Sequence, residues 1–234
     1  MRIRIIAVLA PIMLVLGCTT PRETIAIVAP QPANGAGAQP SLAALSSQAQ
    51  NGDDAAAMRL ADVYYRAGRA VDAVKWMKLA AERGSAAGQA GMGRAYTLGI
   101  GVPQDYSLAL KYNQLAVDQN GAAGLNNLAF QYSHGFGVPV DPDKASKLFR
   151  RSAMQGDVFA QSALGNLYAE GTGVPKNSHL AYFWNSLAAT GLTSTSLEVV
   201  AKRRDAIAAT LPPGVLASLQ TAATNWTPGT EPPQ

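Results

Sequence analysis

The chain lacks the residue types on which many enzymes and disulfide-stabilised proteins depend. Cys18 is the only cysteine among 234 residues, so no internal disulfide can form. The two histidines, His134 and His179, have no Cys, Asp or Glu at the spacing of a metal site. The Gly-x-Ser-x-Gly motif, a phosphate loop with a lysine and His-Glu-x-x-His are all missing. We therefore expect no catalytic residue, no metal and no cofactor.

Charge of either sign is also scarce. The 19 basic and 15 acidic residues give a net charge of +4, and the only basic clusters are Lys202-Arg203-Arg204 and Arg150-Arg151. Clusters this short are typical of solvated helix faces, so we expect no nucleic-acid partner. The carboxylates are scattered, which leaves no obvious acid pair for glycoside hydrolysis. No small-molecule substrate is expected.

The apolar run near the N-terminus is too short to cross a bilayer as a mature helix. It has twelve residues, from Ile5 to Leu16, it follows Arg2 and Arg4, and it ends at Gly17-Cys18. A basic start, a short apolar centre and a small residue before the cut site are typical of a secretory signal. Removal of residues 1–17 leaves 17 basic against 15 acidic residues, a net charge of +2.

The end of this segment resembles the bacterial lipobox, with a cysteine at the cut site. The resemblance implies that Cys18 is lipidated and becomes the first residue of the mature chain. Several acyl chains anchor a protein durably where a single chain binds only marginally. Thr19 stands where an aspartate would signal the inner membrane, so the resemblance implies an outer-membrane anchor facing the periplasm. The alternative is an ordinary signal peptide with an incidental cysteine.

A five-residue phrase occurs three times at a step of 36 residues. The copies are Gly99-Ile100-Gly101-Val102-Pro103, Gly135-Phe136-Gly137-Val138-Pro139 and Gly171-Thr172-Gly173-Val174-Pro175. The same step relates three tyrosines before the phrase and three alanines after it, Tyr96, Tyr132, Tyr168, Ala109, Ala145 and Ala181. A period of this length predicts a unit that cannot bury its own apolar face and must stack on its neighbours.

Each phrase is predicted to connect two helices. Upstream, a large residue precedes the tyrosine by one turn, as Leu128 precedes Tyr132. Downstream, small and large residues recur at steps of three and four, as in Ala109, Tyr112 and Ala116. Glycine and proline between the two helices stop the first from continuing. The residues positioned to cap the second helix are Asp105, Asp141 and Asn177.

The combined pattern resembles the Sel1-like repeat, a relative of the tetratricopeptide repeat. It covers roughly Asp53 to Leu192, and the first copy has a connector shortened to Arg66-Ala67-Gly68-Arg69. The resemblance implies an all-α, right-handed α/α solenoid of helical hairpins with C-terminal capping helices. Some Sel1-like proteins brace each repeat with a disulfide, which this sequence cannot do.

The expected organisation has five parts. These are a signal peptide at 1–17, the lipidated cysteine and a flexible tether at 18–40, the repeat array at 41–192, capping helices at 193–227 and a disordered tail at 228–234. Within the array we expect a capping helix at 41–51, a degenerate repeat at 53–84, and full repeats at about 86–121, 122–156 and 158–192. Helices are expected from Ser196 to Thr210 and from Val215 to Trp226 in the C-terminal part.

In related tetratricopeptide arrays the first helix of each unit lines the concave face. Carried over to this sequence, that register implies ten partner-binding residues: Met58, Asp62, Tyr65, Arg94, Thr97, Asn126, Phe130, Ser133, Ser162 and Asn166. Polar and aromatic side chains along a groove suit an extended peptide or a helix of a partner. The groove could instead be inert, or filled by the chain's own C-terminal helices.

The function predicted from the sequence is that of a non-catalytic protein-interaction module, anchored to the cell envelope through Cys18. We expect a protein or peptide partner in the envelope. Two alternatives stay open at this point. One is a scaffold lipoprotein of exopolysaccharide export, and the other is an envelope enzyme that acts on cell-wall material.

Overall fold

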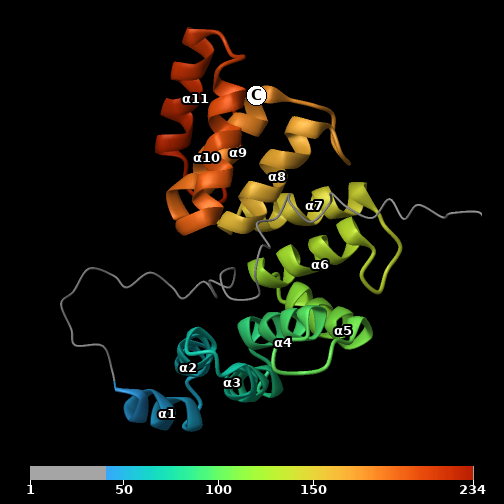
Figure 1. Cartoon of the computed structure of the whole chain (residues 1–234), viewed down its shortest axis with the longest axis vertical. Coiled ribbons are helices and arrows are strands. Elements are labelled where there is room, and N and C mark those ends of the chain that lie inside the picture. Colours follow the sequence, from blue (N-terminus) through green and yellow to red (C-terminus); the bar gives the residue numbers. More distant parts are fainter. Residues whose placement is uncertain (1–40, 234) are drawn as a thin grey trace, which may run out of the picture.

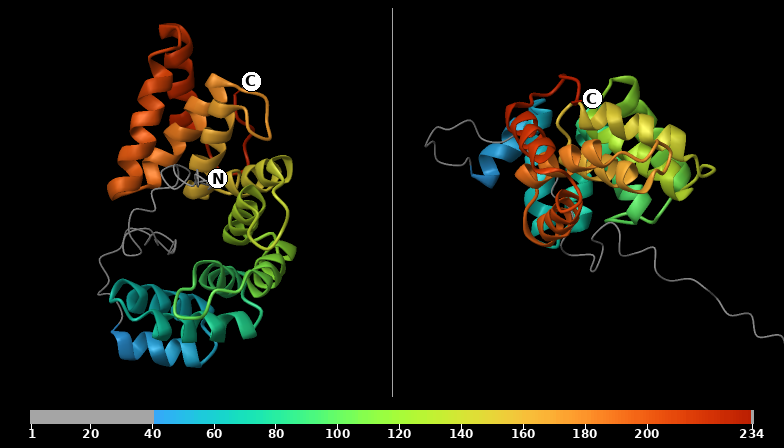
Figure 2. Two further views of the ribbon diagram at one scale, coloured as in Figure 1. Left: turned by 45° about the vertical axis from the view of Figure 1, so that its right-hand side comes forward. Right: turned by 90° about the horizontal axis from the view of Figure 1, so that it is seen from above.

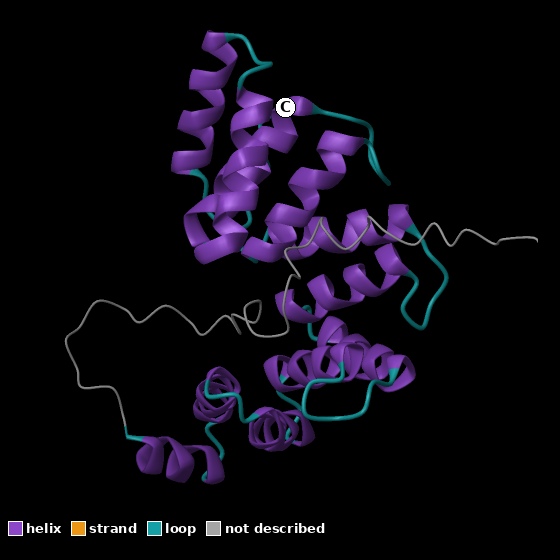
Figure 3. Cartoon of the chain, in the orientation of Figure 1, coloured by secondary structure: helices purple, strands orange, loops and turns teal. Residues whose placement is uncertain are grey.

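The computed structural model describes residues 41–233, and this part of the chain is entirely helical, without strands (Figure 3). The helices are α1 Leu42–Gln50, α2 Asp54–Arg66, α3 Ala70–Glu82, α4 Ala86–Leu98, α5 Tyr106–Asp118, α6 Ala122–His134, α7 Pro142–Ala153, α8 Val158–Glu170, α9 Ser178–Gly191, α10 Ser194–Ala208 and α11 Pro213–Asn225. The predicted all-α solenoid is confirmed. The signal peptide, Cys18 and the tether lie outside the described residues.

Consecutive helices pack on one another from α1 to α10, so the chain is a stack of hairpins (Figure 1). The stack follows an arc (Figure 2, left). The first helices of the repeats are α2, α4, α6 and α8, and the second helices are α3, α5, α7 and α9. In the described residues α4 contacts both α2 and α6, whereas successive second helices make no comparable contact. The first helices therefore lie on the inner side of the arc.

The first glycine of each connector ends a first helix. Gly99, Gly135 and Gly171 have φ values of 68°, 74° and 79°, the left-handed conformation that glycine adopts without strain. Each backbone N–H donates to a carbonyl of the last turn. This is the turn that the glycines of the repeated phrase predicted.

A backbone hydrogen bond closes each connector at its far end. The N–H of Asp105 donates to the carbonyl of Tyr96 at 3.0 Å, and Asp141 to Tyr132 and Asn177 to Tyr168 do so at 2.9 Å. The side chains of these capping residues accept hydrogen bonds from the first turn of the second helix, as predicted. In the first repeat, Arg69 donates to Tyr64 at 2.8 Å, so the shortened connector closes in the same way.

The second glycine of each connector lies against the preceding repeat. A Cβ on Gly101 would overlap the carbonyl of Ala70, and one on Gly173 would overlap the carbonyl of Pro142. Ala70 and Pro142 are the first residues of α3 and α7. The connector of one repeat thus packs on the second helix of the repeat before it, and only glycine allows this approach.

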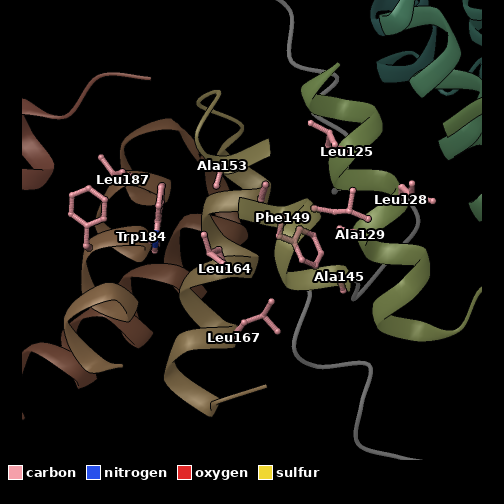
Figure 4. Packing of buried hydrophobic residues seen from close by; sticks show 13 residues of the cluster. Leu125, Leu128, Ala129, Ala145, Phe149, Ala153, Leu164, Leu167, Trp184 and Leu187 are labelled. Carbon is pink, nitrogen blue, oxygen red and sulfur yellow. The ribbon is translucent and has the colours of Figure 1, made fainter. Parts of the chain in front are cut away.

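In each full repeat a small residue near the middle of the first helix leaves room for a side chain of the second helix. Gly93 and Gly165 lie against Asn113 and Asn185, and a Cβ on either glycine would overlap that asparagine. In the repeat between them the equivalent position is Ala129, which belongs to a buried cluster of α6 to α9 (Figure 4). The pairing keeps each helical hairpin tightly packed.

Asn113 is fully buried and links three helices. Its amide nitrogen donates to Gln131 Oε1 at 2.8 Å, and its oxygen accepts from Asn127 at 3.2 Å. Asn127 also donates to the carbonyl of Ala90 at 2.9 Å. Because buried polar groups are costly when unpaired, this network fixes the register of α4, α5 and α6.

The C-terminal helices stack on the end of the array. Helices α10 and α11 both pack against α9, within one or two residues of the predicted ranges. In one buried cluster Val200 of α10 packs near Val158 of α8, so α10 covers the end of the last hairpin. Val200 of α10 and Leu219 of α11 are the buried anchors.

Residues 228–233, for which the sequence predicted a disordered tail, contact the array in the structure. The N–H of Gly229 donates to the carbonyl of Met154 at 2.8 Å, and Glu231 pairs with Arg150 at 2.6 Å. The physical reason is Trp226, which packs against the cluster of α6 to α9 and draws the following residues onto α7.

Replacement of Gly173 by alanine should destabilise the array. We expect a loss of about 2–4 kcal/mol of unfolding free energy, since the left-handed φ of 66° and the overlap with Pro142 both disfavour a Cβ. The measurement is the midpoint of urea unfolding. Gly214→Ala is the matched control, because no atom lies within 4 Å of the added Cβ. An equal effect of the two substitutions would contradict the packing role of Gly173.

Candidate interaction site on the inner face

The residues predicted to bind a partner all lie on the first helices α2, α4, α6 and α8. Nine of them are half-buried, which is the exposure expected of a docking surface. We call these nine residues the inner face: Met58, Asp62, Tyr65, Arg94, Asn126, Phe130, Ser133, Ser162 and Asn166. Thr97 is the exception. It is only 4% exposed, and its hydroxyl donates to the carbonyl of Gly93 at 2.8 Å, so it is part of the core.

Arg94 of α4 is the electrostatic centre of the inner face. Burial raises the pKa of Tyr65 on α2, and the Arg94 guanidinium partly offsets this rise. Burial also raises the pKa of Asp157, and Arg94 again acts in the opposite direction. Arg94 therefore acts electrostatically on a tyrosine of α2 and on the residue that precedes α8.

Asp157 was not among the predicted residues. It is the N-cap of α8, and its carboxylate accepts from the N–H of Ala160 at 2.8 Å. In the sequence, Asp157 could be recognised only as a residue that can cap the start of a helix. The effect of Arg94 on the pKa of Asp157 has no signal in the local sequence.

On α2, Asp62 forms an ion pair with a residue of the same helix. One carboxylate oxygen pairs with Arg66 Nε at 2.8 Å, and the side chain is 13% exposed. The other oxygen, Oδ1, is buried and has no hydrogen-bond partner among the described residues. Met58, one turn earlier, packs against the N-terminal core, so α2 offers a carboxylate beside an apolar patch.

Aromatic rings gather at the third repeat. Phe130 lies 4.2 Å from the ring of His134 and 5.6 Å from that of Phe136, measured between centroids. Tyr106 stacks on Phe136 at 5.0 Å. The sequence did not predict this cluster, because Phe136 occupies the variable position of the repeated phrase. His134 is structural, as its Nδ1 lies 2.7 Å from Ser133 Oγ and 3.0 Å from the carbonyl of Phe130.

Three polar side chains of the inner face are available to a ligand. Asn126, Ser162 and Asn166 are half-buried, and among the described residues none of their side chains makes a hydrogen bond. Ser162 and Asn166 are one turn apart on α8, and Asn126 holds on α6 the position that Ser162 holds on α8. An amide can both donate and accept, which suits the N–H and carbonyl groups of a peptide backbone.

Across residues 41–233, no three His, Cys, Asp or Glu side chains are placed to hold a metal ion. In the same range no helix has the length and hydropathy needed to cross a membrane.

Four of the five residues in the two basic clusters have a polar partner in the described part of the chain. Lys202 pairs with Glu198 at 2.7 Å and Arg204 with Asp205 at 2.7 Å, while Arg151 donates to Asn120 at 2.9 Å. These contacts, with the pair of Arg150 and Glu231, agree with solvated helix faces.

The chain belongs to the Sel1 repeat family. The family model matches four copies, at residues 54–85, 86–121, 122–157 and 158–191, which together make up more than half of the chain. These copies coincide with the hairpins α2–α3, α4–α5, α6–α7 and α8–α9. Sel1 repeats generally mediate protein–protein interaction, and the family is generally a non-catalytic scaffold.

Solved structures of the same family resemble this fold. A Sel1 repeat protein from Oxalobacter formigenes is 30% identical, with a TM-score of 0.52 over 69% of this chain and 48% of that one. The protein c5321, a protective antigen present in uropathogenic Escherichia coli strains, is 28% identical, with a TM-score of 0.54 over 78% of this chain and 40% of that one. This chain thus covers less than half the length of either structure. No curated protein matched significantly.

Substitution of Asp157 should separate its capping role from its charge. Asp157→Ala removes the cap as well as the charge, and loss of a cap is expected to cost about 1 kcal/mol. Asp157→Asn keeps an acceptor for the first turn. Because burial raises the pKa of Asp157, the folded state holds this proton more tightly than the unfolded state, and the associated stability is lost as pH rises through the folded pKa.

Relative to the wild type, Asp157→Asn should therefore gain stability as pH rises from below the unfolded pKa to neutrality. Urea midpoints of both proteins across this pH range provide the measurement. A difference that stays constant with pH would show that the carboxylate is not destabilised by burial.

Proposed function

We propose that the inner face binds an extended segment of a protein partner. The observation that carries this proposal is the set of half-buried amide and hydroxyl groups on α6 and α8, Asn126, Ser162 and Asn166, which have no side-chain hydrogen bond in the described residues. Phe130 lies one turn from Asn126, so an apolar anchor accompanies the polar groups. A peptide backbone paired with the amides and a side chain placed on Phe130 would use both.

We further propose that the protein works at the surface of the cell envelope, held there by lipid on Cys18. The support is the N-terminal sequence, in which two arginines and an apolar run precede Gly17-Cys18. An anchored array would restrict its partner to the same surface. This raises the local concentration of the two proteins without any additional contact between them.

Bulky charge on the inner face should abolish partner binding. The test variant carries Asn126→Arg and Asn166→Arg, both at half-buried positions with no intramolecular role in the described residues. The control carries Gln114→Arg and Gln220→Arg, at exposed positions of α5 and α11. Crosslinking in envelopes followed by affinity purification should recover a partner with the wild type and the control, and at least tenfold less with the test variant.

The stability of both variants must be measured as well. Their free energies of unfolding in urea should agree to within about 0.5 kcal/mol, as for surface substitutions. If both variants capture the partner equally, the inner face is not the binding site.

The anchor is tested separately. Cys18→Ala should release the mature chain from the membrane fraction, whereas Thr19→Ala leaves the cysteine in place and should stay bound. Fractionation of cells and mass spectrometry of the N-terminal peptide give the readout. Membrane retention of the Cys18→Ala chain after removal of the signal would refute the lipid anchor and would leave the inner-face proposal untouched.

A further inference from the structure

The last residues of the chain form a strap that returns to the array. We define the C-terminal strap as residues 226–233, which follow α11 and lie on α7 and the turn after it. Within the strap, Trp226 Nε1 donates to the carbonyl of Thr230 at 2.9 Å, so the segment has a defined bend. The strap is therefore an ordered ligand-like segment seated on the rest of its own chain.

The surface under the strap has three distinct contacts. The indole of Trp226 meets Trp184 edge-on at 5.9 Å between centroids, and Trp184 is fully buried. Pro228 lies over Gly156, where a Cβ would approach it to 3.3 Å. Arg150 of α7 pairs with Glu231. Together these contacts recognise an aromatic residue, a Pro-Gly bend and an acidic residue in that order.

The strap is attached to this surface by few strong interactions. The ion pair is exposed, with 51% of Arg150 and 73% of Glu231 accessible, and pairs of this kind contribute little. The hydrogen bond from Gly229 to Met154 is the one backbone bond between the strap and the array among the described residues. Burial of the Trp226 indole must therefore supply most of the binding energy.

We propose that the surface under the strap is a peptide-binding site and that its partner in trans is the strap of a second copy of this chain. The occupant is defined by the structure itself, since this strap is the segment seated there. An exchange needs only a rotation at the end of α11, where the strap has no further helical hydrogen bonds. Exchange of an identical terminal segment is a low-cost route to a dimer.

Crowding decides whether the exchange takes place. The strap competes in cis at an effective concentration on the order of millimolar, so a second copy must reach a similar local concentration. Confinement to a membrane surface would provide this, and in this respect alone the inference rests on the proposed lipid anchor. The contacts of the strap come from α7, the turn to α8 and α9, and none of them involves a residue of the inner face, so a strap-exchanged pair leaves that face accessible.

A labelled peptide of residues 226–233 tests the site directly. The receptor is the full chain with Trp226→Ala, in a Cys18→Ser background that removes lipidation. We expect saturable binding by fluorescence anisotropy, at least tenfold weaker for a receptor that keeps Trp226, because its own strap fills the site. The peptide with Trp226→Ala should not bind. Equal binding to both receptors, or none to a folded Trp226→Ala receptor, overturns the proposal.

Should Trp226→Ala unfold the chain, a second receptor carries Gly229→Pro and Glu231→Arg. The first change removes the N–H that donates to Met154 and conflicts with the positive φ of 90° at Gly229, and the second places two like charges together at Arg150. This receptor keeps the Trp226 side chain. It should again bind the wild-type peptide more tightly than the wild-type receptor does.

Exchange between copies is tested with two single variants, Arg150→Cys and Glu231→Cys, both in the Cys18→Ser background. Oxidation of an equal mixture at millimolar protein should give a disulfide-linked heterodimer, and either variant alone should give much less. The double variant in one chain is the control, since it should close an internal disulfide and so show that the geometry permits the bond. A control that closes internally without heterodimers in the mixture would overturn the second copy as partner.

Discussion

The architecture depends on the contact between each connector and the second helix of the preceding repeat. Gly101 and Gly173 lie against the first residues of α3 and α7, where no Cβ fits. This contact joins one hairpin to the previous one on the connector side, and the contacts of α4 with α2 and α6 join them on the inner side. With both sides fixed, every repeat has one position relative to its neighbour, and the arc follows from repetition.

The framework is periodic, but the inner face is not. Arg94, Phe130 and Asn166 occupy the same position in three successive repeats, and they present a cation, an aromatic ring and an amide. In the three full repeats, the connector glycines, the tyrosines and the caps of the second helices keep their chemistry. An array built this way separates stability from recognition, because a change on the inner face does not disturb the glycine contacts between repeats.

The sequence was informative about the framework because a repeat displays its own constraints several times. The connectors, the caps at Asp105, Asp141 and Asn177 and the first-helix register were all visible in the 36-residue step. The extent to which each side chain is buried was not visible in the repeat. Thr97 and Ser133 hold equivalent positions, yet Thr97 is buried against Gly93 and Ser133 is half-exposed. The effect of Arg94 on the pKa of Asp157 joins residues 63 positions apart and also has no local signal.

The ends of the array differ, and the difference explains why the tail is ordered. At the N-terminal end α1 covers α2 with two buried aliphatic side chains, Leu45 and Ala49. At the C-terminal end the last repeat contains Phe183 and Trp184, both fully buried, and these large rings need more cover than α10 and α11 provide. Trp226 completes that cover. A segment required for burial at one end, but attached there mainly by one aromatic side chain, is a segment that another copy can supply.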